Sequence, residues 1–523
     1  MHVEIYDTTL RDGTQQEGIS LTASDKLAVA RLLDELGVAY IEGGWPGANP
    51  KDDEFFRRAK TELELEHATL VAFGSTRRAN RRPDDDEQLA ALLEAGTEVV
   101  CLVGKAWSYH VEHALRTSRD EAVAMVADSV EYLRSRGRRV FFDAEHFFDG
   151  YRDDPGFALA VLEAALAAGA ERLVLCDTNG GFLTHDVERV VGEVTDALPD
   201  GVYGCHFHND TGLAVANSLT AVRLGVHQVQ GCVNGYGERT GNADLCSVIP
   251  NLTLKMGLPS IPEDRLPRLT SISHHVAEVV NLTLDPHLPY VGTSAFTHKA
   301  GLHTSALARR SDAYEHLPPE TVGNTTRVVV SELAGRSTVL AKARASGLDL
   351  TSEEAQVVVE RIKELEHEGY HFEAADGSFE LLVRAAQGWR QPFFDLESYR
   401  VFVERRDGEV VAEATVKVHV DGERIVSTRE GDGPVAALDR ALRAALAPSY
   451  PQIDHIRLTD YRVRDLDSAH GTAARVRVLC RHEDGEGAWG TVGVHENIID
   501  ASWKAVSEGL IVGLLRAGLD DDA

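Results

Sequence analysis

The sequence predicts an α/β protein that begins with a (β/α)8 TIM barrel, continues with helical linker subdomains and ends in an α+β domain with an internal duplication. Eight short apolar runs alternate with helix-like segments in the first half of the chain, and polar or glycine residues follow each run. Near the end, two strand-rich segments are each closed by a helix. We expect domains at residues 1–260, 261–397 and 398–523.

Length and charge narrow the class of protein. A chain of 523 residues exceeds one hydrophobic core, so two or three domains are expected. The net charge of -30, spread along the chain, argues against a nucleic-acid partner. The six cysteines form no CxxC pair, which fits reduced thiols in the cytoplasm. We see neither a signal peptide nor an apolar run long enough for a membrane span, and expect a cytoplasmic protein.

The eight apolar runs have the character of parallel strands. Continuous apolar runs indicate strands that are buried on both faces. Between the first two runs, apolar residues of segment 24–37 recur at spacings of three and four up to Gly37, which predicts a helix, and segment 155–169 has the same form. Eight such strand–helix units indicate a closed barrel. The runs are residues 3–6, 38–41, 68–73, 99–103, 139–142, 172–175, 202–207 and 228–233.

Polar residues follow every predicted strand. In a (β/α)8 barrel the chemistry takes place at the carboxyl ends of the strands. Buried polar groups without partners are costly, so we interpret this ring of polar residues as a functional site. The segments are residues 7–13, 42–44, 74–76, 104–105, 143–146, 177–180, 206–210 and 234–237.

The seventh run ends in His206-x-His208, which suggests a metal site. Residues i and i+2 of a strand share a face, and two imidazoles suit a borderline divalent metal. Asp12 follows the first strand, which neighbours the seventh and eighth strands in a closed barrel, and Asn242 follows the eighth. Two histidines and a carboxylate with open positions describe a catalytic site. The alternatives are hydrogen-bonded histidines, a helix cap or an Arg11 salt bridge for Asp12, and a loop cap for Asn242.

Arg11 would project beside this metal. A metal with a guanidinium suits an α-keto acid, because the metal chelates the carboxylate and keto oxygens and Arg11 stabilises an oxyanion. Thr178 can donate a hydrogen bond to the carboxylate, and Glu145 is a candidate general acid or base. A strand-end hydroxyl bonded to backbone is the alternative for Thr178, and a salt bridge with a barrel arginine is the alternative for Glu145.

The second half contains no metal or nucleophile constellation. Residues 261–397 are rich in proline and in helix-like segments, such as the amphipathic segment 352–368. From Ser398 onward, strands within 414–428 precede a helix over 434–446, and strands within 474–494 precede a helix over 497–515. This repeated order indicates a duplicated α+β domain.

Several motifs resemble the α-isopropylmalate synthase/homocitrate synthase family of acetyl-CoA-dependent Claisen condensing enzymes. Residues 7–16 are similar to its opening signature, and residues 204–210 and 235–242 to its metal signatures. The resemblance covers essentially the whole chain and is strongest to the long citramalate synthase branch. The stretches diagnostic of that branch are residues 141–150, 175–181, 292–303 and 330–337.

The resemblance implies that acetyl-CoA and pyruvate give citramalate and CoA, in isoleucine biosynthesis. Where isopropylmalate synthases commonly read His-Gln-Asp-Gly, this chain has His303-Thr-Ser305-Ala306, so an acid is missing and the proton path is left open. The implied site residues are Asp12, His206, His208 and Asn242 for a divalent metal (Mg, Mn or Zn), Arg11, Gln15, Thr178 and Tyr314 for the keto acid, and Arg11, Glu145 and His303 for catalysis.

The resemblance also implies a homodimer in which His303 acts within one chain or comes from a neighbouring subunit. The C-terminal domain would be regulatory, with isoleucine bound near the interface of its two repeats, and a purely dimerising domain is the alternative. Three rival functions remain: a 2-isopropylmalate synthase that takes 2-oxoisovalerate, a carbon–carbon lyase of the same barrel superfamily, and a non-catalytic amino-acid sensor. The duplicated domain argues against the lyase, and the Arg11, Asp12, His206 and His208 set argues against the sensor.

Overall fold

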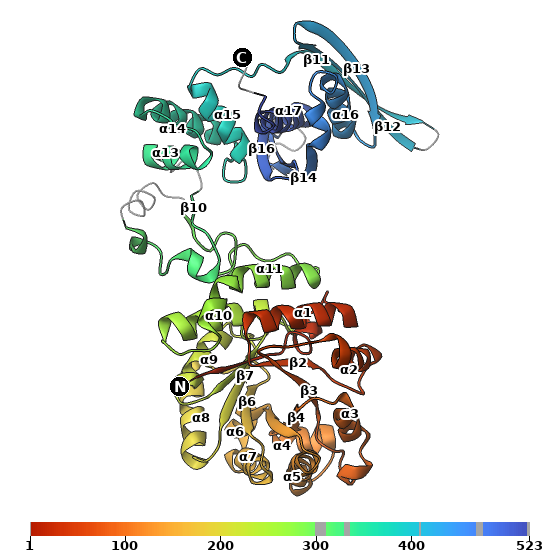
Figure 1. Cartoon of the computed structure of the whole chain (residues 1–523), viewed down its shortest axis with the longest axis vertical. Helices are drawn as coiled ribbons and strands as arrows, with labels where there is room; N and C mark the ends of the chain where they lie inside the picture. The colour runs from red at the N-terminus through yellow and green to blue at the C-terminus, as the bar shows by residue number, and fades with distance from the viewer. Residues whose placement is uncertain (1, 299–309, 329–334, 407–408, 467–473, 520–523) are drawn as a thin grey trace. The chain divides into compact units, whose positions relative to one another are not determined.

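The computed structural model describes residues 2–298, 310–328, 335–406, 409–466 and 474–519. The chain forms two compact units (Figure 1). The first comprises Met1–Phe296 with Leu317–Thr325, and the second comprises Thr297–His316 with Thr326–Ala523. The first unit therefore continues beyond residue 260. No helix in the described part of the chain is long and apolar enough to cross a membrane.

The first unit is a closed barrel of eight parallel strands, as the sequence predicts. Each strand pairs with the next along the chain, and β1 closes the ring by pairing with β8 in a register from Glu4 with Gln228 to Asp7 with Gly231. The strands are β1 (Glu4–Asp7), β2 (Tyr40–Gly44), β3 (Thr69–Ser75), β4 (Val99–Lys105), β5 (Arg139–Glu145), β6 (Arg172–Asp177), β7 (Tyr203–Phe207) and β8 (Gln228–Gly231).

Helices surround these strands (Figure 1). The first one shows how the sequence sets their limits: Thr22 and Asp25 form a capping box at its start, and Gly37 ends it with a φ of 87°. The helices are α1 (Ala23–Leu36), α2 (Pro50–Glu62), α3 (Glu87–Ala95), α4 (Ser108–His110), α5 (Arg119–Ser135), α6 (Phe147–Asp153), α7 (Pro155–Ala168), α8 (Thr184–Ala197), α9 (Ala214–Arg223), α10 (Leu245–Pro250) and α11 (Leu269–Val279).

The inside of the barrel is packed, so the site can form only at its mouth. Tyr6 of β1 and Phe141 of β5 lie 6.2 Å apart across the barrel, and Tyr40 contacts Phe141 edge-on at 5.0 Å. The loops that follow β1 and β8 are also hydrogen-bonded to each other. Thr9 Oγ1 donates to Asp7 Oδ2 at 3.0 Å and accepts from the Val233 amide at 3.0 Å, which joins the loops after β1 and β8.

The second unit begins with short strands and helices. Strands β9 (Thr297–His298) and β10 (Arg327–Val328) pair in parallel. Three helices follow, and the second agrees closely with the segment 352–368 that the sequence predicts. They are α13 (Arg336–Ala345), α14 (Ser352–His367) and α15 (Asp376–Ala386).

Two similar three-stranded antiparallel sheets, each followed by a helix, complete the second unit and confirm the predicted duplication. Each repeat begins with a further strand, β11 or β14, whose bounds the sequence pattern does not indicate. The first repeat is β11 (Asp395–Arg406), β12 (Glu409–Val420), β13 (Glu423–Gly431) and α16 (Pro434–Leu446). The second is β14 (Arg457–Asp465), β15 (Val476–Glu483), β16 (Ala488–His495) and α17 (Ile498–Arg516).

The repeats share one hydrophobic core. Leu438 and Leu442 of α16 and Leu510 and Leu514 of α17 are all at most 2% exposed and belong to a single buried cluster. The interface between the repeats within one chain is therefore filled by apolar side chains.

Candidate active site

A cavity of about 600 Å³ lies at the carboxyl ends of the barrel strands. Its walls contain most of the residues that the sequence singles out, carried by the ends of β5 and β7 and by the loops that follow β1, β6 and β7. The predicted residues that line it are Arg11, Asp12, Gln15, Glu145, Thr178, His206 and His208.

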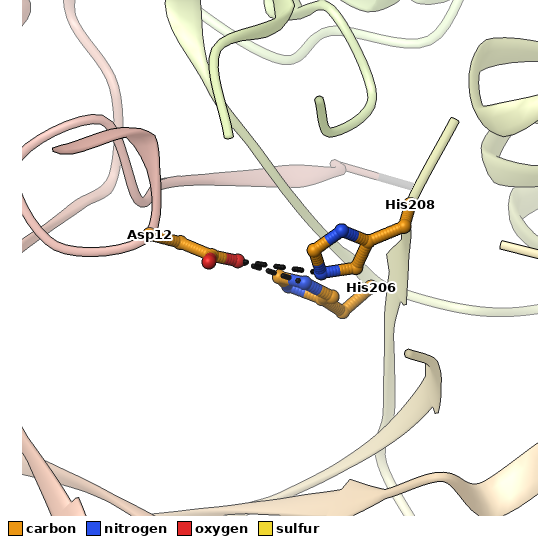
Figure 2. A group of neighbouring side chains, drawn as sticks. All are labelled: Asp12, His206 and His208. Carbon is orange, nitrogen blue, oxygen red and sulfur yellow. Dashed lines mark ion pairs between the residues drawn. The ribbon is translucent and has the colours of Figure 1, made fainter. Parts of the chain in front are cut away.

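Asp12, His206 and His208 converge at this cavity (Figure 2). Asp12 Oδ2 lies 3.2 Å from His206 Nε2 and 3.6 Å from His208 Nε2. All three side chains are buried, and their potential ligand atoms lie within 4.8 Å of one another. Because β1 and β7 both pair with β8, the barrel brings together the three residues that the sequence suggests as metal ligands.

The hydrogen bonds around His206 leave its outer nitrogen free for a ligand. Gln230 donates its amide N–H to Asp143 Oδ1 at 2.9 Å, so its Oε1 accepts from His206 Nδ1 at 3.0 Å. A proton on Nδ1 leaves a lone pair on Nε2, which faces the Asp12 carboxylate. His206 Nε2 and Asp12 Oδ2 are 3.2 Å apart, and a cation bound between them would offset the repulsion of their lone pairs. A histidine that binds a metal normally donates its other ring N–H to an acceptor, as His206 does to Gln230.

Asn242 lies beside His208 and could supply a fourth donor atom, its amide oxygen. An isolated antiparallel bridge pairs the two residues. Asn242 Nδ2 donates to the Tyr236 carbonyl at 3.0 Å, which fixes the orientation of the amide. Its Oδ1 is buried and has no hydrogen-bond partner in the described part of the chain. Gly237 makes room for this amide, because a Cβ there would lie 2.3 Å from Asn242 Nδ2.

The donor set fits a divalent metal. Burial would raise the pKa of Asp12, but Arg11 and the two imidazoles hold it well below its usual range, so the carboxylate is charged. Burial, followed by repulsion from His206, lowers the pKa of His208 to about 4, so its imidazole is neutral near pH 7. Burial lowers the pKa of His206, but Asp12 raises it above its usual value, so a metal bound there would displace its proton. The ionised carboxylate, the neutral His208 imidazole and the unused amide oxygen are species that bind such an ion.

Arg11 is held next to this cluster by a buried acid. Its Nε donates to Glu42 Oε2 at 2.5 Å, and its Nη1 lies 3.5 Å from Asp12 Oδ1. The guanidinium also lies over the Phe73 ring, 3.9 Å from the centroid. Glu42 in turn accepts from the Tyr6 hydroxyl at 2.8 Å. These contacts give the guanidinium one orientation at the cavity wall.

The other predicted residues occupy different parts of the wall. Glu145, at the end of β5, forms an ion pair with Lys105 at the end of β4. Thr178 Oγ1 accepts a hydrogen bond from the His146 amide at 2.8 Å, which leaves its own proton available. Gln15 is exposed on a single 3-10 turn at the cavity rim.

The structure does not test two of the predicted residues. Tyr314 belongs to the second unit and is 47% exposed. His303 lies outside the described residues. Their assigned roles therefore stay predictions.

The structure adds four residues to which the sequence had given no role: Glu42, Lys105, Asp143 and Gln230. Glu42, Lys105 and Asp143 belong to the ring of polar residues that follows the predicted strands, so the sequence pattern could have indicated them as site residues. Gln230 lies within an apolar run, and only the pairing of β7 with β8, in which His206 and Gln230 are partners, indicates its function.

A closed (β/α)8 barrel with a two-histidine, one-carboxylate cluster at its mouth defines a barrel enzyme. The HMGL-like family matches residues 2–275, the homocitrate synthase post-HMGL domain-like family matches residues 290–370, and the LeuA allosteric (dimerisation) domain matches residues 373–512. The chain belongs to the HMGL-like family, within the group that contains the (R)-citramalate synthases. Enzymes of this family depend on a divalent metal.

Full-length relatives support this placement. The (R)-citramalate synthase of Streptomyces coelicolor is 54% identical over 98% of this chain and 97% of its own length. That of Aquifex aeolicus is 49% identical over 98% of each. A probable 2-isopropylmalate synthase of Methanopyrus kandleri is 34% identical over 97% of each.

Proposed function

We propose that this protein is an (R)-citramalate synthase, which joins the acetyl group of acetyl-CoA to pyruvate and releases citramalate and CoA. The main support is that Arg11 lines the same cavity as the Asp12, His206 and His208 cluster. In addition, the chain resembles such synthases over its full length. The difference in identity to the 2-isopropylmalate synthase favours pyruvate over 2-oxoisovalerate.

The proposed site holds the keto acid with its own side chains. The carboxylate of pyruvate accepts from the free Thr178 hydroxyl, and Gln15 closes the rim. Arg11 stabilises the negative charge that develops on the keto oxygen. A divalent metal bound by Asp12, His206, His208 and Asn242 supplies Lewis acidity to the keto acid.

Glu145 is proposed to remove a proton from the acetyl methyl group. The resulting carbanion attacks the keto carbon, whose oxygen takes up a proton, and water then cleaves the thioester to release CoA. His303 is the proposed partner of Glu145 in these proton transfers. Lys105 forms an ion pair with Glu145 and so fixes the direction of this proposed base at the cavity wall.

The decisive experiment measures CoA release from acetyl-CoA with and without pyruvate and divalent metal, with chiral analysis of the product. We expect release to need both additions and kcat/KM to be highest with pyruvate in a panel that includes 2-oxobutyrate and 2-oxoisovalerate. A preference for 2-oxoisovalerate would transfer the protein to the isopropylmalate branch. Since one methylene changes binding by only ~1–3 kcal/mol, all three acids should react measurably.

We further propose that the enzyme is a cytoplasmic homodimer whose activity isoleucine lowers through the C-terminal domain. The match of residues 373–512 to an allosteric (dimerisation) domain supports this. An effector that touches none of the catalytic groups acts only by binding two states differently, typically by ~1–3 kcal/mol. An isoleucine titration of the full-length enzyme, with its mass measured by light scattering, tests both statements.

A further inference from the structure

The loop between β8 and α10, residues 232–244, carries Asn242 and contacts the loops that follow β6 and β7. Its Gly241 carbonyl accepts a hydrogen bond from the Asn209 amide at 2.8 Å. Arg239 lies in the same loop, three residues before Asn242, and none of the proposed chemical steps uses it. Its guanidinium nevertheless binds a residue in each of the two neighbouring loops.

The contacts of Arg239 have a defined geometry. Its Nε and Nη2 donate to the two carboxylate oxygens of Asp210, at 2.8 and 2.9 Å, in a bidentate arrangement. Nη2 also donates to the Thr178 carbonyl at 2.8 Å. Arginine presents its donors in a rigid planar fork, so these contacts fix direction as well as distance. A lysine cannot reproduce them, because an ammonium is a compact charge on a flexible chain.

The backbone is shaped so that these loops can meet. Arg239 has a positive φ of 57°, a conformation that is uncommon for a residue with a side chain. Gly180, two residues after Thr178, has a φ of 61°, and a Cβ there would lie 2.5 Å from Asp210 Oδ2 and 2.8 Å from the His208 carbonyl. Such backbone conformations persist where surrounding contacts hold them in place, and they concentrate at functional sites.

Each of the three loops carries a group that is assigned to the site. Thr178 belongs to the loop after β6, His208 stands two residues before Asp210 in the segment after β7, and Asn242 follows Arg239. An isolated antiparallel bridge pairs His208 with Asn242. Arg239 therefore joins the residue proposed to hold the keto acid to two of the candidate metal ligands.

We propose that Arg239 is a positioning residue, which holds Thr178, His208 and Asn242 in one arrangement and so links the keto-acid end of the site to its metal end. It contacts neither the metal nor the keto acid in this role, because it acts through Asp210 and through the Thr178 carbonyl. The part that concerns Thr178 rests on the proposed function, whereas the part that concerns the metal ligands does not.

This role differs from a general contribution to stability. The side chains of Arg239 and Asp210 are 41% and 26% exposed, and ion pairs near the surface contribute little to the free energy of unfolding. Loss of the guanidinium should therefore change the site while the barrel remains as stable as before. A variant at Arg239 separates the two effects.

The test measures two affinities in the full-length protein. Binding of Mn²⁺ is followed from the electron paramagnetic resonance signal of the free ion, and the KM for pyruvate is measured from CoA release at saturating Mn²⁺. In Arg239→Gln we expect the Kd for Mn²⁺ and the KM for pyruvate each to rise at least ~10-fold, as for other groups that orient a metal ligand. The midpoint of urea unfolding should stay at the wild-type value.

Further variants identify the contact. Asp210→Asn leaves the Thr178 contact in place, so it should weaken Mn²⁺ binding by less than Arg239→Gln does. The double variant should lose no more than Arg239→Gln alone, since both changes act through one contact. Arg239→Lys retains the charge without the fork and should behave like Arg239→Gln. Arg223→Gln, which breaks a surface pair with Glu188 between α9 and α8, is the matched control and should retain both wild-type affinities.

The outcomes separate this inference from the proposed function. If Arg239→Gln binds Mn²⁺ like Arg223→Gln, or if the wild type binds no Mn²⁺, the role of Arg239 is wrong, even when CoA is released with pyruvate. If Mn²⁺ binding weakens only in the Arg239 and Asp210 variants while no keto acid releases CoA, the metal part stands and the proposed reaction fails.

Three other results would overturn parts of the proposal. An unchanged KM for pyruvate in Arg239→Gln would refute the link to Thr178. Wild-type affinities in Arg239→Lys would replace the planar fork with a simple effect of charge. A lower unfolding midpoint in Arg239→Gln, with the same drop in affinity as in stability, would reduce Arg239 to a residue that only stabilises the barrel.

Discussion

Arg11 and Glu42 form an ion pair in which Nε lies 2.5 Å from Oε2, beside the Asp12, His206 and His208 cluster. Glu42 is fully buried, so its charge is compensated chiefly by this guanidinium. The same contact fixes the direction in which Arg11 meets the cavity.

Glu42→Gln should therefore reduce both stability and activity. Removal of one partner of a buried pair costs about 3 kcal/mol of unfolding free energy, and a misplaced guanidinium lowers kcat/KM roughly 100-fold. Urea unfolding and steady-state kinetics measure the two effects. Glu62→Gln, which breaks a surface pair with Arg58, is the control and should change neither quantity. Wild-type kinetics in Glu42→Gln would show that Arg11 needs no such support.

His208→Ala should remove the metal and leave the fold intact. The substitution deletes one imidazole from a set that already contains Asp12 and His206, and we expect metal affinity to fall by more than roughly 100-fold. Metal content after dialysis, measured by mass spectrometry, gives the result, and far-UV circular dichroism reports the fold. His185→Ala, at an exposed position of α8, is the matched control. Full metal content in His208→Ala would contradict the ligand assignment.

Gly237→Ala should act on the metal through Asn242. Gly237 has a φ of 148°, and an added Cβ would meet the Asn242 amide nitrogen, so the amide must move. We expect metal affinity to decrease ~10–100-fold, as for other groups that orient a ligand. Gly192→Ala, inside α8 with open space around it, should leave affinity unchanged and stabilise the helix by about 1 kcal/mol. Equal affinities in both variants would exclude Asn242 from the metal site.

Lys105→Met should lower the activity through the position of Glu145. The ion pair with Lys105 holds the Glu145 carboxylate in place at the end of β5, so its loss lets the proposed base turn away from the acetyl group. We expect a roughly tenfold lower kcat/KM. Lys51→Met, which alters an exposed lysine of α2, should retain the wild-type kcat/KM. Wild-type kinetics in Lys105→Met would show that Glu145 needs no such support.

His482 should make the second unit sensitive to acid. It is fully buried on β15, and burial, aided by Arg443, lowers its pKa from 6.5 to about 4. Between these values the unfolded chain binds a proton that the folded chain does not, so stability falls as the pH falls from 6.5 to 4, by about 3 kcal/mol in total. His482→Phe should reduce this slope in urea unfolding, and His455→Gln, at an exposed position, should not. Identical slopes in all three proteins would rule out His482 as the source.

Sequence patterns predicted the barrel and its ligand cluster because both depend on local periodicity. The apolar runs give the strands, and the spacing of His206 and His208 places both on one strand face. Closure of the ring then brings Asp12 to them. The functions of Gln230 and Glu42 could not be predicted in this way, since each depends on a contact with another strand.

The second unit shows a different limit of sequence reasoning. β14 (Arg457–Asp465) carries many charged and exposed side chains, so its apolar pattern is weak, and only its pairing with β15 identifies it as a strand.

The link between Asp7, Thr9 and Val233 has a consequence for how the protein matures. The proposed metal ligands come from the first strand–helix unit and from the last two, and this link joins those units. During synthesis, Asp12 leaves the ribosome long before its partners do, and the ligand set is complete only when the ring has closed. Uptake of metal by a growing or refolding chain should therefore mark the moment of closure, and a chain that ends before β8 should have no high-affinity metal site.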